Sequence, residues 1–311
     1  MGSSQPVILD ARGGMPYEAF NQLPISKFRV GGGTIEVAFA PGEIELGRQP
    51  LLDWISAAAR AVAAYYGRFP VSRVQVLVIP APGRGIGSGT TFGYRGAAIK
   101  VAVGRETLAE DLGRDWVMTH EMVHLAFPDV ADEHEWIEEG IATYVEPLGR
   151  VQAGQLPVEK VWADLVWGLP KGLPQSGDHG LDHTPTWGRT YWGGALFCLL
   201  ADIEIRERTQ NRRGLQDALR AIVAAGGNVE VHWPLERALD LGDRATGVPV
   251  LRELYDRMKA TPVQVDLPLL WSRLGVKAEG PTILFDDGAP LAHIRRTITI
   301  GSSVRDDAPR S

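Results

Sequence analysis

The pattern of apolar and polar positions predicts strands in the first third of the chain. Residues 34–40 (TIEVAFA) and 41–46 (PGEIEL) alternate, and the Pro-Gly between them favours a turn, so we expect two paired strands. Residues 71–80 (VSRVQVLVIP) predict another strand, ended by its proline. A glycine-rich link then leads into residues 90–104, and we expect an edge strand or hairpin there, at about residues 97–103.

Apolar positions with helical spacing predict four long helices, at residues 51–66, 107–127, 132–146 and 190–209. The second opens on a Thr-x-x-Glu capping box and the third on a similar Asp-x-x-Glu pair. A proline follows the expected end of each of these two helices, which marks the boundary. Glycine and proline are frequent in residues 168–188, which predicts a loop.

The last part of the chain mixes both kinds of pattern. From about residue 213 to residue 275, helical stretches alternate with short polar links. Residues 282–300 read as two strands around a turn at Asp287 and Gly288.

Composition narrows the class of protein. A chain of 311 residues with 44% hydrophobic content can bury a large core. The net charge is −6, both signs are scattered and no basic run occurs, so we expect no nucleic-acid partner. No run of about eighteen apolar residues occurs, so we expect no membrane span. The single cysteine, Cys198, lies in an apolar run and indicates a buried side chain.

Residues 120–124 (HEMVH) contain two histidines four residues apart, which suggests a metal-binding site. On a helix, His120 and His124 lie on one face and can direct their imidazoles at one point, which is the spacing a metal needs. Glu121 is turned about 100° from His120, the position of a carboxylate that takes a proton from a water activated by the metal. The alternative is an exposed amphipathic helix, and the apolar flanks WVMT and LAF argue against it.

A catalytic zinc site needs a third protein ligand, and the helix at residues 132–146 offers several carboxylates. Glu139 lies between apolar positions, where a carboxylate is costly unless it meets a metal or a cation. Glu138 is the second choice, and Gly140 permits close approach of another backbone. The acids at the start of this helix favour a solvated first turn, in which we also place His134.

Two segments resemble the gluzincin metallopeptidases. HEMVH followed by WIEEGIATY is similar to their metal motif, in which a Trp-x-x-Glu-Gly segment supplies the third ligand, here Glu139. TYWGGA resembles their Tyr-x-x-Gly-Ala helix, whose tyrosine steadies the tetrahedral intermediate, here Tyr191. The C-terminal helical part is similar to that of the glycyl aminopeptidase family, and the likeness covers roughly residues 51–275.

The resemblance and the pattern together predict an α+β fold with a thermolysin-like zincin core, built from a mixed sheet and active-site helices. We expect a short N-terminal β segment (1–50), the catalytic domain (51–210), a helical C-terminal domain (211–275) and a β-hairpin tail (276–311).

These observations predict zinc-dependent hydrolysis of peptide bonds, with one Zn²⁺ per chain on His120, His124 and Glu139. Glu121 is the expected general base, and Tyr191 is expected to donate to the oxyanion. The alternative for Tyr191 is a core tyrosine at a helix start.

The chain also departs from the gluzincin aminopeptidases. Only fourteen residues (125–138) separate His124 from Glu139, fewer than in those enzymes. We expect their large N-terminal β domain to be reduced to about fifty residues here, with no PDZ-like module after the helical part. Residues 89–96 (GTTFGYRG) replace their Gly-x-Met-Glu-Asn type motif, so the glutamate that would hold a free amine is missing.

We therefore expect endopeptidase-like cleavage, with an extended substrate paired to the edge strand. The alternatives are an aminopeptidase and a non-catalytic zinc-containing module that binds peptides. The loop at residues 178–183 carries Asp178, His179, Asp182 and His183, which either line the cleft, bind a second cation or are polar turn residues.

The expected partner is a peptide or protein substrate, and the sequence carries no signal for an oligomeric state. The opening Met-Gly-Ser-Ser is typical of residues added for recombinant expression, so a native leader could precede residue 5. With the family resemblance, this leads us to expect an extracytoplasmic location, periplasmic or secreted.

Overall fold

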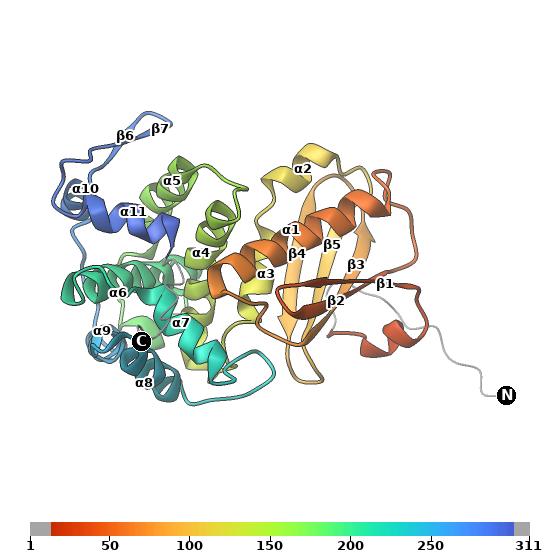
Figure 1. The fold of residues 1–311 in the computed structure, drawn as a ribbon, viewed down its shortest axis with the longest axis horizontal. Coiled ribbons are helices and arrows are strands. Elements are labelled where there is room, and N and C mark those ends of the chain that lie inside the picture. Colours follow the sequence, from red (N-terminus) through yellow and green to blue (C-terminus); the bar gives the residue numbers. More distant parts are fainter. Residues whose placement is uncertain (1–13, 302–311) are drawn as a thin grey trace, which may run out of the picture.

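A five-stranded mixed sheet forms one side of the molecule (Figure 1). The computed structural model describes residues 14–301, so the opening residues discussed above lie outside the described part. The strand order is β1–β2–β3–β5–β4; β2, β3 and β5 are parallel, and β1 and β4 are antiparallel edges. The strands are β1 (Ile25–Val30), β2 (Gly33–Phe39), β3 (Arg73–Ala81), β4 (Ile86–Phe92) and β5 (Ala98–Gly104).

The partner of β2 differs from the predicted one. β2 pairs with β1 across a two-residue turn of Gly31 and Gly32, whose φ angles are 55° and 88°, conformations that glycine adopts at little cost. Residues 41–46 form no strand, so the strand pair expected around Pro41 and Gly42 was wrong. The apolar–polar alternation correctly predicted β2 as a strand, but it does not determine which neighbouring segment pairs with β2.

Of the edge strand or hairpin expected in residues 90–104, the hairpin is confirmed, because β5 pairs antiparallel with β4. The edge on this side of the sheet is β4, not the segment at residues 97–103. All seven residues of β5 are buried, because β5 lies between β3 and β4. The apolar–polar alternation in the sequence of β5 is due to Lys100, which suggested an exposed face. The Lys100 side chain is instead buried, with its Nζ 5.7 Å from the centre of the Phe92 ring. The second half of the glycine-rich link and the residues after it therefore form the edge strand β4.

Helices cover one face of the sheet and an N-terminal segment covers the other. The long helix α1 (Arg48–Tyr66) crosses the sheet and contacts two helices that carry the candidate site (Figure 1). On the opposite face, η1 (Tyr17–Asn21) packs Tyr17 and Phe20 against Ala38 and Leu77. This second, smaller apolar cluster explains why the parallel strands are buried on both faces.

The helix expected at residues 107–127 is two helices, α2 (Ala109–Arg114) and α3 (Val117–His124). The break is at Asp115, whose backbone is extended and whose carboxylate accepts hydrogen bonds from the Val117 and Met118 N–H groups at 3.0 and 3.1 Å. Asp115 therefore caps the helix that carries the histidines. The capping signal at Thr107 misled the prediction, because its hydroxyl donates to the Gly104 carbonyl instead.

The next helix continues where the sequence predicted an end. After the turn η2 (Asp132–His134), α4 runs from Glu135 to Gln152 and passes through Pro147. An interior proline costs a helix about 3 kcal/mol. α4 tolerates it because residues 144–150 are all buried and the helix packs against α1 and α6. The expected close approach at Gly140 is confirmed: a Cβ there would lie 2.4 Å from the Gly194 Cα.

The rest of the described chain is mainly helical and packs around α4 and α6 (Figure 1). The elements are α5 (Val158–Gly168), η3 (Leu169–Gly172), η4 (Leu181–His183), η5 (Gly188–Gly193), α6 (Gly194–Arg208), α7 (Leu215–Ala224), α8 (Leu235–Thr246), α9 (Val250–Met258), α10 (Leu267–Leu274), β6 (Val276–Glu279), β7 (Thr282–Phe285) and α11 (Ala292–Ile300). Within residues 14–301, no helix is both long and apolar enough to cross a membrane.

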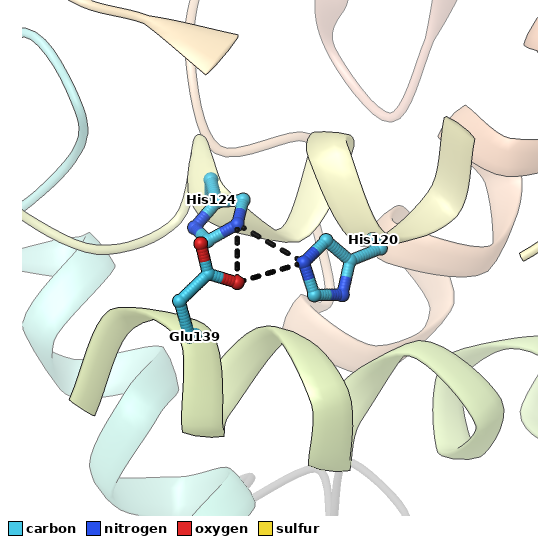
Figure 2. A group of neighbouring side chains, drawn as sticks. All are labelled: His120, His124 and Glu139. Atoms are coloured by element: carbon cyan, nitrogen blue, oxygen red, sulfur yellow. Dashed lines mark hydrogen bonds and ion pairs between the residues drawn. The ribbon is translucent and has the colours of Figure 1, made fainter. Parts of the chain in front are cut away.

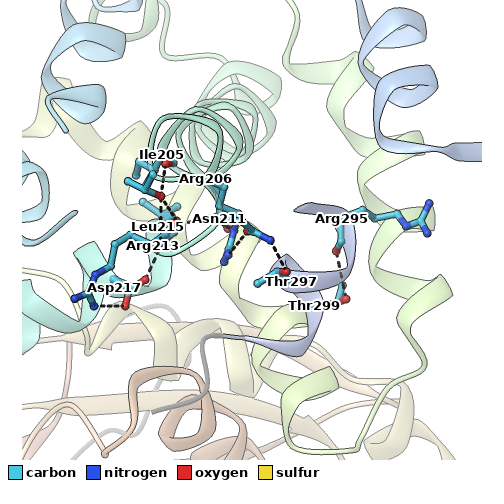
Figure 3. Close-up of polar contacts among 12 residues, drawn as sticks. Ile205, Arg206, Asn211, Arg213, Leu215, Asp217, Arg295, Thr297 and Thr299 are labelled. Atoms are coloured by element: carbon cyan, nitrogen blue, oxygen red, sulfur yellow. Dashed lines mark hydrogen bonds and ion pairs between the residues drawn. The ribbon is translucent and has the colours of Figure 1, made fainter. Parts of the chain in front are cut away.

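The tail was predicted correctly only in part: a β-hairpin forms within residues 276–311, but not around the predicted turn at Asp287 and Gly288. β7 pairs with β6 through a turn at Gly280, and residues 292–300 form α11 instead of a second strand. The β-branched residues at the end of the chain favoured a strand, but Ile294 and Ile298 are buried with helical spacing. Figure 3 shows one contact that holds this helix: the Asn211 amide donates to the Thr297 hydroxyl at 2.9 Å. The predicted domain boundaries stay a prediction.

Candidate active site

A cavity of about 740 Å³ lies between the edge strand β4, the helices α3 and α4, and a turn at residues 229–232. It is lined by all of the residues expected to act in catalysis or metal binding: His120, Glu121, His124, Glu139 and Tyr191. The fold therefore brings the predicted site residues to one place, although they come from three helical segments.

Three of these side chains point at one another (Figure 2). His120 Nε2 lies 3.0 Å from Glu139 Oε2, His124 Nε2 lies 3.5 Å from the same oxygen, and the two imidazole nitrogens are 3.3 Å apart. The histidines descend from α3 and the carboxylate rises from α4. Among the described residues, this is the group of His, Cys, Asp and Glu side chains close enough to share a metal ion.

The donor set fits zinc. A tetrahedral ion with ligand bonds of about 2.0–2.1 Å requires donor atoms roughly 3.3 Å apart, and the three separations bracket that value. Two imidazoles and one carboxylate also form a set of three protein ligands that leaves a coordination position open for catalysis. His120 is 4% exposed, so water alone does not satisfy it.

The pKa values of these groups reflect their closeness. Burial would lower the pKa of His124, but the hydrogen bond and charge of Glu139 more than offset it and raise this pKa to about 9. Burial would raise the pKa of Glu139, but the hydrogen bonds from His120 and His124 hold it well below its usual range. Positive charge is therefore favoured between these side chains, and a metal cation supplies it without protons.

Aromatic rings hold His120 in place. Trp116 meets the His120 ring edge-on with 5.2 Å between centroids, and Tyr191 stacks on it at 6.2 Å. Tyr191 belongs to η5, a π-helical turn that precedes α6 in place of the regular helix expected there. Such turns are frequent at functional sites because they re-aim side chains. The π-helical turn places Tyr191 in the cavity beside Glu139.

Tyr191 keeps its proton. Burial, and then the charge of Glu139 and a hydrogen bond with it, raise the pKa of the Tyr191 phenol. A protonated phenol can donate a hydrogen bond to a developing oxyanion.

Glu121 is held by the edge strand. Its side chain is buried, and the Thr91 hydroxyl of β4 lies 2.7 Å from Glu121 Oε2. Glu121 does not belong to the group of three converging side chains, as expected for a general base.

Glu138, the second choice for the third ligand, also faces the cavity but lies outside the group of three. Its Oε1 accepts a hydrogen bond from the Val130 N–H at 2.9 Å. Burial raises the pKa of Glu138 to about 7. This carboxylate would gain from a positive partner.

The loop at residues 178–183 does not line the cavity. Asp182 accepts hydrogen bonds from Trp136 and Tyr255 and contacts His134 Nδ1 at 3.1 Å. Asp178 forms a buried ion pair with Arg189 at 2.8 Å. Both acids therefore brace the loop against its neighbours, and the cleft or second-cation interpretation was wrong. His134 is buried against Asp182, not solvated as expected.

Sequence reasoning missed three ionisable residues of the cavity, Asp129, Glu230 and His232. His232 Nδ1 lies 2.9 Å from Asp129 Oδ2, and Glu230 accepts a hydrogen bond from the Ala97 N–H at 3.1 Å. Asp129 could have been anticipated, because it lies only five residues after His124, in the turn that begins beside the site. No sequence signal indicates that residues 229–232, about a hundred positions later, return to it.

No protein-family model and no curated protein matches the sequence. Solved structures do match. An aminopeptidase N family protein from Idiomarina loihiensis aligns with a TM-score of 0.59 at 13% identity, over 82% of this chain and 49% of its own. An M1 zinc metallopeptidase variant from Deinococcus radiodurans, bound to a Tyr-ser-ala substrate, aligns with a TM-score of 0.52 at 17% identity, over 79% and 53%. This chain shares the fold of M1 zinc metallopeptidases.

The chain spans about half the length of these solved structures. The shared fold agrees with the predicted α+β class and with the resemblance to gluzincin-type peptidases. The narrower likeness to glycyl aminopeptidases and the thermolysin-like details stay predictions.

Proposed function

We propose that this protein hydrolyses peptide bonds with a zinc ion held by His120, His124 and Glu139. The observation that carries the proposal is the convergence of these three side chains, at zinc-compatible separations, in a cavity that also holds Glu121 and Tyr191. The shared fold with M1 zinc metallopeptidases supports it.

Zinc, when bound, would supply Lewis acidity that polarises the scissile carbonyl and makes a water more acidic. Glu121 takes the proton of the attacking water and can pass it to the leaving amine. Tyr191, protonated at neutral pH, donates a hydrogen bond to the oxyanion as the carbonyl becomes tetrahedral. His120 and Glu121 are themselves buried, so their interactions act in a medium of lower dielectric constant than water, which strengthens them.

Replacing Tyr191 by phenylalanine should lower kcat by about 10²–10³ with KM little changed, because the hydroxyl acts on charge that develops only in the transition state. The ring stays, so its stacking on His120 and the zinc content should be preserved. Steady-state kinetics with metal analysis measures both. An unchanged kcat would make Tyr191 a core tyrosine.

The cavity favours an aminopeptidase over the expected endopeptidase. The endopeptidase prediction rested on the lack of acids along the substrate strand, and β4 indeed carries none. Other elements supply them: among the described residues, the cavity lining has five carboxylates and no lysine or arginine. Glu121 and Glu139 have other roles, so Asp129, Glu138 and Glu230 are left to attract a positive group.

We propose that Glu138 holds the terminal ammonium of the substrate. It lies next to Glu139 on α4 and faces the cavity, outside the group of three proposed metal ligands. An ammonium is costly to desolvate unless carboxylates lie within hydrogen-bond reach. The aminopeptidase N family protein among the structural matches supports the same mode.

A pair of otherwise identical peptides, one with a free amine and one N-acetylated, tests this mode. Acetylation removes the positive charge of the terminal ammonium. The value of kcat/KM should therefore fall about 10–100-fold, which corresponds to the free energy of one hydrogen bond to a charged group. Glu138→Gln should reduce the difference between the two peptides. Equal cleavage of both peptides at internal bonds would establish the endopeptidase instead.

The second candidate is a zinc-containing module that binds peptides without cleaving them. The exposed edge of β4 beside the cavity is the observation that favours it, since an extended peptide can pair there. Binding without hydrolysis by the zinc-loaded protein would identify this function. It leaves the placement of Glu121 and Tyr191 unexplained.

A further inference from the structure

The edge strand β4 contacts the general base candidate directly. The Thr91 Oγ1 lies 2.7 Å from Glu121 Oε2 and 2.8 Å from the Glu121 backbone oxygen. A threonine hydroxyl has one proton, and an ionised carboxylate is the stronger of the two acceptors. Thr91 therefore donates mainly to Oε2.

A second residue of β4 leaves room for the same carboxylate. A Cβ added at Gly89 would lie 2.4 Å from Glu121 Cγ and 2.8 Å from Glu121 Oε1. The φ angle of Gly89 is not in the left-handed region, so its backbone suits any residue. Space for Glu121, not chain flexibility, is what requires glycine here.

Register explains how both residues reach Glu121. Gly89 and Thr91 are two apart on β4, opposite Val101 and Ile99 of β5, and so they share one face of the strand. That face contacts α3. Thr90, between them, is exposed and its hydroxyl donates to the Gly89 carbonyl. On this face of β4, Thr91 therefore donates a hydrogen bond to the Glu121 carboxylate, and Gly89 leaves the space that the carboxylate occupies.

We propose that Thr91 is a positioning residue for the general base, and that Gly89 provides the space in which Thr91 holds it. This inference rests on the proposed function, because it gives Thr91 a role in that reaction. A glutamate side chain has three rotatable bonds, and a free carboxylate would sample several orientations. Fixing Oε2 to β4 restricts these orientations and leaves Oε1 for the proton transfer.

The first test compares Thr91→Val, which keeps the shape and loses the donor, with Thr91→Ser, which keeps the donor. We expect Thr91→Val to lower kcat on the order of tenfold with KM within about twofold of wild type. Thr91→Ser should recover most of kcat. Equal kcat in Thr91→Val and wild type, or a change in KM alone, would overturn the proposal, since a structural or substrate-binding role predicts those outcomes.

A double-mutant cycle separates positioning from general damage to β4. In a Glu121→Gln background, Thr91→Val should have no further effect on the residual rate, because the group that it positions is already disabled. A full additive loss would assign the effect of Thr91 to another part of the site. Gly89→Ala should lower kcat by a different route, by displacing Glu121, while zinc content stays at the wild-type level.

A crystal structure of zinc-loaded Thr91→Val gives a readout that needs no turnover. We expect the Glu121 carboxylate to rotate or to occupy several orientations. A carboxylate unmoved from its wild-type position would overturn the positioning role, whether or not the protein is a peptidase. Conversely, zinc-loaded wild-type protein that cleaves no peptide would refute the proposed function and leave this structural result to decide the role of Thr91.

Discussion

Glu121→Gln should abolish nearly all peptide hydrolysis and leave zinc binding intact. The amide keeps the size and the hydrogen bond with Thr91 but cannot take a proton at neutral pH, so kcat should fall on the order of 10³-fold or more. His120, His124 and Glu139 form their group without Glu121, which is why metal content should not change. Kinetics and elemental analysis on the same preparation measure both quantities.

Two outcomes for this variant would contradict the assignment. Turnover close to wild type would mean that another group accepts the proton. Loss of zinc together with activity would show that Glu121 supports the metal site, and its role as a base could no longer be separated from that support.

Glu139→Gln should remove most of the bound zinc, and with it all activity. The substitution takes away the one negative ligand of the group, leaving two neutral imidazoles that must hold a dication alone. Glu138→Gln is a matched control, because it makes the same change one residue away on the same helix, at a side chain outside the group.

Zinc content after dialysis compares the two variants directly. We expect about one zinc per chain in Glu138→Gln and almost none in Glu139→Gln. The reverse pattern would show that Glu138 is the third ligand. Thermal unfolding of both metal-free variants should be measured alongside, so that a folding defect is not mistaken for a lost ligand.

The sequence predicted the centre of this site because short-range geometry defines it. His120 and His124 are four residues apart, and helix periodicity alone places their imidazoles together. Glu139 was chosen because it lies among apolar neighbours on its own helix, which is again a local property. Each of these predictions depended only on about two turns of the helix that contains the residue, and not on contacts with distant parts of the chain.

Features that depend on distant parts of the chain could not be predicted. Glu230 and His232 reach the cavity because the C-terminal helices fold back against the turn at Asp129, and no local pattern encodes that return. The identity of the edge strand depends on sheet order, so β5 was mistaken for an edge although it is interior. The edge matters, because β4 supplies the contact between Thr91 and Glu121.

Tertiary contacts also overrode local signals within single elements. Pro147 was expected to end α4, but burial of the surrounding residues carries the helix past it. Asp115 interrupts the expected long helix because its carboxylate caps the helix that carries the histidines. For Pro147 the surrounding packing decided the result, whereas Asp115 acts through a local cap that the sequence prediction overlooked in favour of Thr107.

The most direct test of zinc-dependent peptide hydrolysis is mass spectrometry of a mixed peptide pool incubated with the protein in three states: zinc-loaded, stripped by a chelator, and reloaded with zinc. We predict new cleavage products in the first state, their loss in the second and their return in the third. An intact peptide pool after incubation with fully zinc-loaded protein, or undiminished cleavage by the stripped protein, would contradict the account.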